Sequence, residues 1–154
     1  MLARYSSPLG PVAVRFEGDA IVRLRWEPET PEPDAADLPD DPLVQATGAQ
    51  LAAYFAGTLD RFDLPLRPAG SEFQKAVWRC MVRIPKGRTR TYGELADELG
   101  RPARAVGTAC GQNPIPVIIP CHRIVAANGR LGGFSASRGV EDKVWLLRHE
   151  RVLL

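Results

Sequence analysis

The sequence predicts a mixed α/β fold of the α+β kind: a small N-terminal domain of antiparallel sheet and helix, then a helical C-terminal domain. Three observations predict it. Apolar and polar residues alternate as in strands only in the first part, helical spacing dominates later, and the net charge changes sign between them. Residues 1–70 hold 6 Lys/Arg and 11 Asp/Glu, net −5, whereas residues 71–154 hold 14 and 7, net +7. We expect domains at residues 1–68 and 69–154.

The N-terminal part begins with two strand-like segments. Residues 12–16 and 21–26 alternate apolar and polar side chains, and Gly18-Asp19 between them favours a tight turn. Residues 28–42 carry five prolines among many acids, which predicts an irregular surface loop. Apolar residues then recur at helical spacing over 43–55, and Gly57 should end that helix.

The C-terminal part begins with two helix-start signals. Residues 71–74 (SEFQ) and 91–94 (TYGE) both have the form of a capping box. Cys80 shares a face of the first helix with apolar residues and is expected to be a small core residue. Gly100 should end the second helix, and Pro102 should open a short third one. Two helices joined by a tight turn containing glycine resemble a helix-turn-helix.

A candidate nucleophile follows an apolar run. Residues 117–119 should form a buried strand that delivers Cys121, beside the imidazole of His122 and the guanidinium of Arg123. Burial can exclude water from such a thiol, and neighbouring positive charge can favour the thiolate. Cys121 is therefore the leading candidate for nucleophilic chemistry.

The chain after this cysteine is expected to contain a turn, a flexible segment and a final helix. Asn128-Gly129 is the turn signal and residues 131–135 are the flexible segment. In the last helix, Val140, Val144 and Leu147 should form one apolar stripe.

Composition excludes several classes of protein. Three cysteines without close spacing and two histidines give neither a disulfide framework nor a zinc site, so we expect no metal and no cofactor. The sequence has no secretory signal and no apolar stretch that could span a bilayer, so we expect a cytoplasmic protein, or a nucleoid protein if it is bacterial, without a membrane partner. We also expect a monomer. The basic C-terminal part suggests a polyanionic partner, although a solvated basic face explains the charge equally well.

Five ordered motifs carry a family resemblance that runs from about residue 73 to residue 150. They are 91–96 (TYGELA), 103–107 (ARAVG), 113–116 (NPIP), 120–124 (PCHRI) and 145–150 (WLLRHE). Together they resemble the O6-alkylguanine-DNA alkyltransferases, also called methylated-DNA–protein-cysteine methyltransferases. The resemblance implies DNA repair by direct, stoichiometric transfer of an alkyl group, usually methyl, from guanine O6 in double-stranded DNA to Cys121. O4-methylthymine is a further candidate substrate.

The resemblance also assigns catalytic residues. It implies a relay in which a water molecule links Cys121 to His122, and Glu150 fixes the tautomer of that histidine. Without the motif, Glu150 would be read as a solvated acid on the last helix. The protein is consumed in a single turnover, because the alkyl group stays on the cysteine.

Binding roles follow from the same motifs. A base inside a duplex is out of reach, so the nucleotide must be flipped out through the minor groove. The resemblance implies that Arg104 fills the vacated stack and that Tyr92 lies near the rotating phosphate and the base. The resemblance further implies that Asn113, Phe134 and Ser135 belong to the substrate pocket. The small side chains of Ala105, Gly107 and Thr108 should let the helix backbone approach the DNA closely.

Three other classes of protein fit the sequence less well. Non-catalytic damage-binding relatives generally lack the cysteine, so Cys121 argues against that class. A helix-turn-helix regulator would need several base-edge readers, yet residues 103–112 offer only Arg104 and Gln112. An unrelated cysteine hydrolase fits least, because His122 is adjacent to its nucleophile.

Overall fold

A three-stranded antiparallel sheet organises the first part of the chain. The computed structural model describes residues 1–132 and 139–153 and separates them into two compact units, unit 1 (Met1–Pro68) and unit 2 (Ala69–Leu154). The sheet has the order β1-β2-β3, so both hairpin connections join neighbouring strands. Its strands are β1 (Leu2–Tyr5), β2 (Val12–Glu17) and β3 (Ala20–Trp26). The two predicted strands are confirmed, whereas the short β1 was not predicted.

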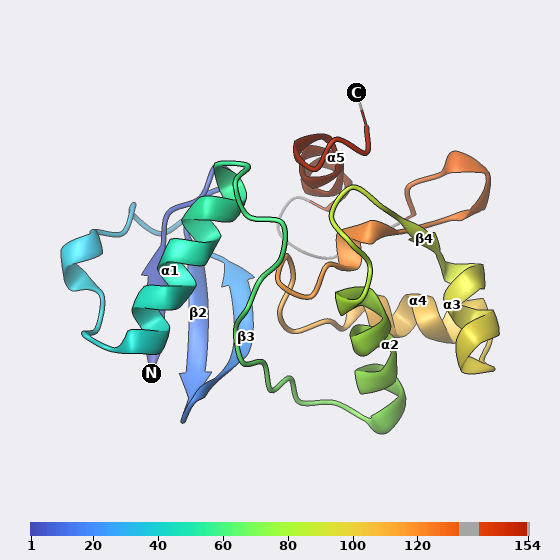
Figure 1. Cartoon of the computed structure of the whole chain (residues 1–154), viewed down its shortest axis with the longest axis horizontal. Coiled ribbons are helices and arrows are strands. Elements are labelled where there is room, and N and C mark those ends of the chain that lie inside the picture. The colour runs from blue at the N-terminus through green and yellow to red at the C-terminus, as the bar shows by residue number, and fades with distance from the viewer. Residues whose placement is uncertain (133–138, 154) are drawn as a thin grey trace. The chain divides into compact units, whose positions relative to one another are not determined.

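Helix α1 (Pro42–Phe55) covers one face of this sheet (Figure 1). The Asp41 side chain accepts hydrogen bonds from the first backbone amides, which caps the helix as expected for an Asp before Pro. The Tyr5 hydroxyl donates to the Val44 carbonyl at 2.8 Å and so ties the sheet to the helix. A Cβ atom at Gly48 would lie 2.8 Å from the Tyr5 ring, so this close approach requires glycine.

The connection between β3 and α1 is irregular, as its prolines predict. Its one regular piece is the 3-10 helix η1 (Ala35–Asp37), capped by the Asp34 side chain. No residue of this 3-10 helix is buried. The predicted surface loop is therefore confirmed.

Unit 2 is mainly helical (Figure 1). Both predicted capping boxes are present, at Ser71 with Gln74 and at Thr91 with Glu94. Gly100 ends α3 in the left-handed conformation, with φ 64°. The elements are α2 (Glu72–Val82), β4 (Arg90–Thr91), α3 (Tyr92–Leu99), α4 (Ala103–Gly111), η2 (Cys121–Arg123), β5 (Ile124–Val125), η3 (Ala127–Gly129) and α5 (Val140–His149), with β4 and β5 paired in parallel.

The predicted strand at residues 117–119 is wrong. The segment folds back as a buried turn: the Ile119 amide donates to the Ile115 carbonyl at 2.9 Å, and Val117 has a left-handed φ of 72°. Cys121 accordingly sits in the 3-10 helix η2 rather than at a strand end. An apolar run alone cannot distinguish a buried strand from another buried conformation.

The predicted apolar stripe of α5 is also wrong in part. Val140 is 48% exposed, and Val144 is half-buried, whereas Leu147 is buried as expected. The buried face instead includes Asp142 and Lys143. The helix therefore carries polar groups inward, and hydrophobic spacing alone could not locate that face.

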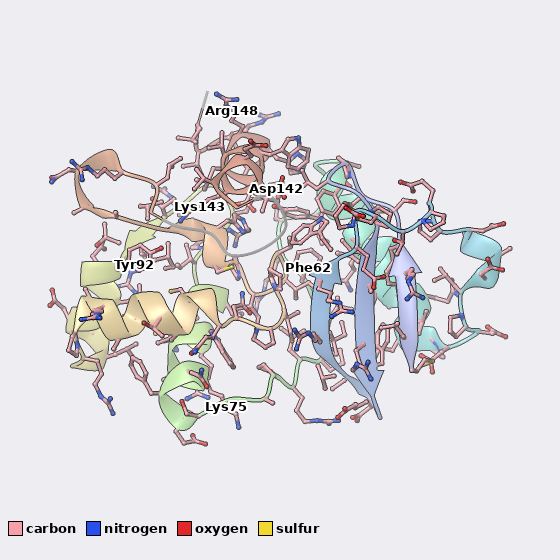
Figure 2. All side chains as sticks on the ribbon, turned by 180° about the vertical axis from the view of Figure 1, so that it is seen from behind. Phe62, Lys75, Tyr92, Asp142, Lys143 and Arg148 are labelled. Carbon is pink, nitrogen blue, oxygen red and sulfur yellow. The ribbon has the colours of Figure 1, made fainter. Side chains whose placement is uncertain are left out.

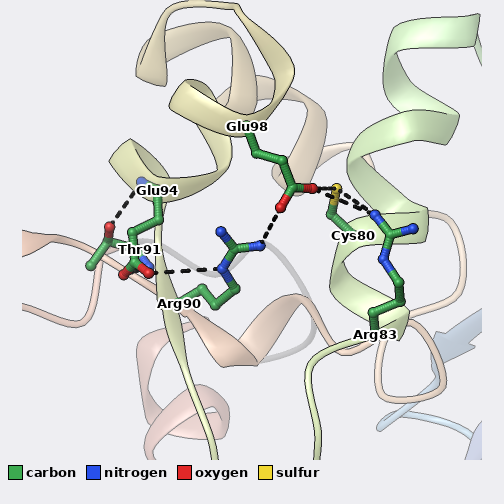
Figure 3. Close-up of polar contacts among 6 residues, drawn as sticks. All are labelled: Cys80, Arg83, Arg90, Thr91, Glu94 and Glu98. Atoms are coloured by element: carbon green, nitrogen blue, oxygen red, sulfur yellow. Dashed lines mark hydrogen bonds and ion pairs between the residues drawn. The ribbon is translucent and has the colours of Figure 1, made fainter.

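Cys80 is buried, as predicted, but it also has polar partners (Figure 3). Its thiol donates to Glu98 Oε2 at 2.9 Å, and an Arg83 nitrogen lies 3.3 Å from the sulfur. Arg90 donates to the other oxygen of Glu98 at 3.0 Å. Burial and the Glu98 carboxylate raise the pKa of Cys80. The cluster links α2, β4 and α3.

Candidate active site

The turn that carries Cys121 is held by Asn113, just after α4. Its side-chain oxygen accepts from the Ile115 amide at 3.0 Å, and its side-chain nitrogen donates to the Ile119 carbonyl at 2.8 Å. The Asn113 side chain also hydrogen-bonds Cys121. One asparagine thus closes the turn and contacts the sulfur.

Glu150 at the end of α5 anchors the two residues that follow Cys121. Glu150 Oε2 lies 2.7 Å from His122 Nε2, and all of these side chains are buried. Arg123 donates to both carboxylate oxygens, at 2.8 and 3.0 Å, and to the Ile84 carbonyl at 2.6 Å. This fork-shaped pairing is geometrically specific and strong. Arg123 is therefore a structural support for Glu150.

The environment determines the protonation states of this pair. Burial alone would raise the pKa of Glu150, but the hydrogen bonds from His122 and Arg123 hold it far below its usual range. Burial lowers the pKa of His122, although Glu150 opposes that effect. A neutral His122 beside an ionised carboxylate carries its proton on Nε2. Its Nδ1, which is buried and has no hydrogen-bond partner among the described residues, is then a free proton acceptor.

Lys143 is the cation that acts on the cysteine. Burial raises the pKa of Cys121 to about 11, while the Asn113 hydrogen bond and the Lys143 charge work against that rise. Lys143 is fully buried and donates to the Ile124 carbonyl at 2.7 Å. Burial lowers its own pKa to about 8. The expectation that His122 and Arg123 supply the positive charge is corrected, because one is neutral and the other is paired with Glu150.

Tyr92, the first residue of α3, lies beside this cation (Figure 2). The Lys143 ammonium is 5.9 Å from the centre of the Tyr92 ring. Cβ atoms built at Gly107 and Gly132 would lie 3.9 Å and 3.0 Å from that ring, so both backbones pass close to it. Burial, followed by the charges of Cys110 and Cys121, raises the pKa of Tyr92 to about 12.

Helix α4 presents a polar side chain to solvent next to small residues. Arg104 and Thr108 are exposed, one turn apart, and the Thr108 hydroxyl donates to the Arg104 carbonyl at 3.1 Å. Ala105 and Gly107 are half-buried. The Arg104 side chain forms no hydrogen bond or ion pair with the residues that the structure describes. The opposite face of α4 packs inward through Val106, Ala109 and Cys110.

The predicted site residues thus fall into three groups. The structure brings Cys121, His122, Glu150, Asn113 and Tyr92 to one region of unit 2, and places Arg104 and Thr108 on an exposed face of α4. Phe134 and Ser135 lie outside the described residues. Sequence reasoning did not identify Cys110, whose pKa is raised to about 12 by burial and then by the charge of Cys121. Its place on the inward face of α4 was the available signal.

Residues 1–132 and 139–153 contain neither a cluster of metal-binding side chains nor a membrane-spanning helix. No group of three or more His, Cys, Asp and Glu side chains in this range could hold a metal ion. No helix in the same range is long and apolar enough to cross a bilayer.

Family models match nearly the whole chain. Residues 72–152 match the model described as "6-O-methylguanine DNA methyltransferase, DNA binding domain", and residues 2–68 match "6-O-methylguanine DNA methyltransferase, ribonuclease-like domain". The chain belongs to the 6-O-methylguanine DNA methyltransferase family. The family resemblance and the α+β fold class predicted from sequence are thereby confirmed.

Individual relatives are similar over most of their length. A methylated-DNA–protein-cysteine methyltransferase of Mycobacterium bovis is 43% identical over 148 residues, 94% of this chain and 88% of the relative. One of Methanosarcina acetivorans is 40% identical over 152 residues, 96% of each chain. The crystal structure of Mycobacterium tuberculosis O6-methylguanine methyltransferase matches with a TM-score of 0.82 at 42% identity, covering 97% and 92% of the two chains. A structure from the same organism in complex with DNA matches with a TM-score of 0.83.

Proposed function

We propose that this protein repairs DNA by moving an alkyl group, above all methyl, from guanine O6 in double-stranded DNA to the sulfur of Cys121. The observation that carries this proposal is the buried Cys121 beside a neutral His122 whose free Nδ1 can accept a proton, in a chain of the methyltransferase family. O4-methylthymine carries its methyl group on an oxygen in the same way, and we include it as a second candidate substrate.

The reaction balances without a cofactor. A bond forms between Cys121 Sγ and the alkyl carbon while the carbon–O6 bond breaks, and its electron pair passes to the guanine. The thiol proton moves through a bridging water to His122 Nδ1, and the repaired guanine gains one proton at N1. Glu150 stabilises the imidazolium that forms in between. Because the alkyl group stays on the sulfur, each protein reacts once.

Lys143 lowers the barrier to forming the thiolate. A thiol with a pKa near 11 is almost entirely protonated at neutral pH, so deprotonation of the buried sulfur adds to the barrier. The buried ammonium of Lys143 and the Asn113 hydrogen bond both favour the charged sulfur. The Cys121 sulfur would then become reactive only when His122 accepts the thiol proton.

Access to the base requires that the nucleotide leave the duplex. Unstacking costs a few kcal/mol, which contacts with the DNA must offset. We propose that the exposed Arg104 enters the vacated stack while Ala105, Gly107 and Thr108 let the α4 backbone approach the minor groove. Tyr92 would then contact the rotated nucleotide, and Phe134 and Ser135 would line the guanine pocket.

Mass measurement after reaction with a duplex carrying O6-methylguanine tests the transfer. The expected result is one methyl group, located on the peptide that contains Cys121, with loss of the methyl group from the DNA. Cys121→Ser should remain unmodified, whereas Cys110→Ser, a matched change at another buried thiol of unit 2, should still accept the methyl group. Tight lesion-selective binding with no mass change would instead identify a non-catalytic damage-binding protein.

A second experiment tests flipping. Arg104→Ala should slow repair of duplex DNA by at least tenfold and leave methyl transfer from the free base O6-methylguanine unchanged, because the free base needs no extrusion. Arg148→Ala, which removes an exposed arginine from α5, is the control for loss of charge. Equal slowing on both substrates would rule out the stacking role of Arg104.

Two organisational proposals accompany the reaction. Units 1 and 2 are two domains with a boundary at residues 68/69, and unit 2 carries both the contact of α4 with DNA and the alkyl acceptor. The protein acts as a monomer in the compartment that holds the DNA, which in a bacterium is the cytoplasm and its nucleoid.

A further inference from the structure

One face of the unit 1 sheet gathers most of that unit's positive charge. Helix α1 covers the other face, and Arg4, Arg15, Arg23 and Arg25 are exposed on the uncovered one, which we call the arginine face. Unit 1 holds six basic residues in all against 11 acidic ones. Four of its six arginines therefore share one face of a net acidic unit.

The strand register brings like charges together on this face. Arg15 of β2 is directly opposite Arg23 of β3, and Ala13 is opposite Arg25. Like charges directly opposite each other destabilise a sheet. The stability of the sheet alone would favour an uncharged or acidic residue at position 15 or 23. An anionic partner that binds both arginines would offset their repulsion.

Acidic side chains neutralise only part of the arginine face. Glu27 lies 2.8 Å from Arg4 and 3.7 Å from Arg25. The side chains of Arg15 and Arg23 form no hydrogen bond or ion pair with the described residues. A shallow depression lies over them, lined by Leu2, Ala13, Arg15, Arg23, Arg25 and Glu27.

The chemistry of the arginine face favours a phosphate ligand. Guanidinium groups present planar, paired N–H donors that match phosphate oxygens. The depression contains no aromatic side chain and only Leu2 and Ala13 as apolar residues, whereas protein interfaces are anchored by buried aromatic and apolar groups. Protein–DNA interfaces, in contrast, are polar and strongly positive.

We propose that the arginine face binds the phosphodiester backbone of DNA, as a contact separate from that of α4. This inference rests on the proposed function, because it takes DNA as the polyanion. The contact reads no bases. It adds affinity that depends on salt.

Binding to an undamaged duplex over a range of salt concentrations tests the proposal. Arg15→Gln/Arg23→Gln should weaken binding about three- to tenfold and reduce the slope of log affinity against log salt by about 1 to 2, as expected when one or two phosphate contacts are lost. Arg61→Gln/Arg67→Gln removes the same charge from the other two arginines of unit 1 and should change neither. Methyl transfer from free O6-methylguanine should equal the wild-type rate in both variants.

Each outcome has a distinct meaning. Wild-type affinity and salt slope in Arg15→Gln/Arg23→Gln would overturn the proposal, and so would an equal loss in the control variant. If sedimentation shows self-association that is lost only in Arg15→Gln/Arg23→Gln, the occupant is the acidic surface loop at residues 28–42 of a second copy rather than DNA. A wild-type protein that binds DNA through these arginines but accepts no methyl group would refute the proposed function alone. Both variants change exposed residues and should fold. Because Arg15→Gln/Arg23→Gln removes a pair of opposed like charges, its denaturation midpoint should be at or above the wild-type value.

Discussion

Glu150 supports the reactive cysteine without touching it. Its carboxylate accepts hydrogen bonds from His122 and Arg123, and all three side chains are almost fully withdrawn from water. A buried carboxylate is tolerated only because each oxygen has a cationic or N–H partner. The same contacts orient the histidine ring, so stability and reactivity depend on one residue.

Replacing Glu150 with Gln is expected to damage both properties. The buried Arg123 loses its counter-charge, which should lower the free energy of unfolding by about 3 kcal/mol. Methyl transfer should slow by roughly 100-fold, because the imidazolium is no longer stabilised. Urea denaturation and single-turnover kinetics measure the two effects. Glu141→Gln, at an exposed position of the same helix, should leave both near wild type, and a fully active Glu150→Gln would exclude the histidine relay.

Lys143 predicts a specific dependence of stability on pH. Its pKa is about 8 in the folded protein against 10.5 in the unfolded chain, so between these values the unfolded state binds more protons. The free energy of unfolding of wild type, relative to Lys143→Met, should therefore rise by about 3 kcal/mol from pH 8 to pH 10.5 and stay constant below pH 8. Denaturant titrations of both proteins at several pH values measure this difference. A flat difference would show that Lys143 keeps an ordinary pKa.

Sequence reasoning located the nucleophile but not its electrostatics. The PCHRI motif singled out Cys121, and the family resemblance added His122 and Glu150. The motif could not show that burial leaves His122 neutral, nor that Arg123 forms an ion pair with Glu150. Lys143 acts on Cys121 only because α5 packs against the η2 turn, and such a tertiary contact has no local sequence signal.

At the level of elements, local signals predicted local structure. The two capping boxes gave the starts of α2 and α3, because a cap is complete within four residues. The strand predicted at residues 117–119 was wrong because the conformation of this segment, a turn over residues 113–119, is not determined locally. Its conformation depends on a side-chain to backbone bond from Asn113 to Ile119, across an apolar segment that reads like a strand.

Removing that side chain should loosen the turn. In Asn113→Ala, the Ile115 amide and the Ile119 carbonyl both lose a buried partner, which should lower the free energy of unfolding by about 2 kcal/mol. Transfer should also slow, since the hydrogen bond to Cys121 is lost. Chemical denaturation and the rate with free O6-methylguanine test this. Gln112→Ala, at the exposed preceding position, is the control. Equal effects of the two changes would contradict the role of Asn113 in holding the turn.

For the whole molecule, net charge proved a coarse guide. The sign change along the chain correctly separated a sheet-containing part from a helical part, yet the acidic total of unit 1 hid four arginines on one face. Charge summed along a sequence records no direction in space. The strand register was needed to show which charges face the same way.

Repair itself should alter the stability of the molecule. Cys121 is only 8% exposed, so a methyl group added to its sulfur must find room among packed neighbours. Overpacking of this kind costs about 1–3 kcal/mol, which corresponds to a fall of several degrees in Tm. Calorimetry before and after reaction with O6-methylguanine DNA measures the change, with undamaged DNA as the control. An unchanged or higher Tm would mean that the site already has space for the product.

The position of Glu150 near the end of α5 has a consequence during synthesis of the chain. The cysteine emerges from the ribosome well before the carboxylate that orients His122. Until α5 has formed and docked, the thiol has no aligned base and an ordinary reactivity. A growing chain would thus not transfer an alkyl group to Cys121 before it is complete. The protein would become reactive only once α5 has folded.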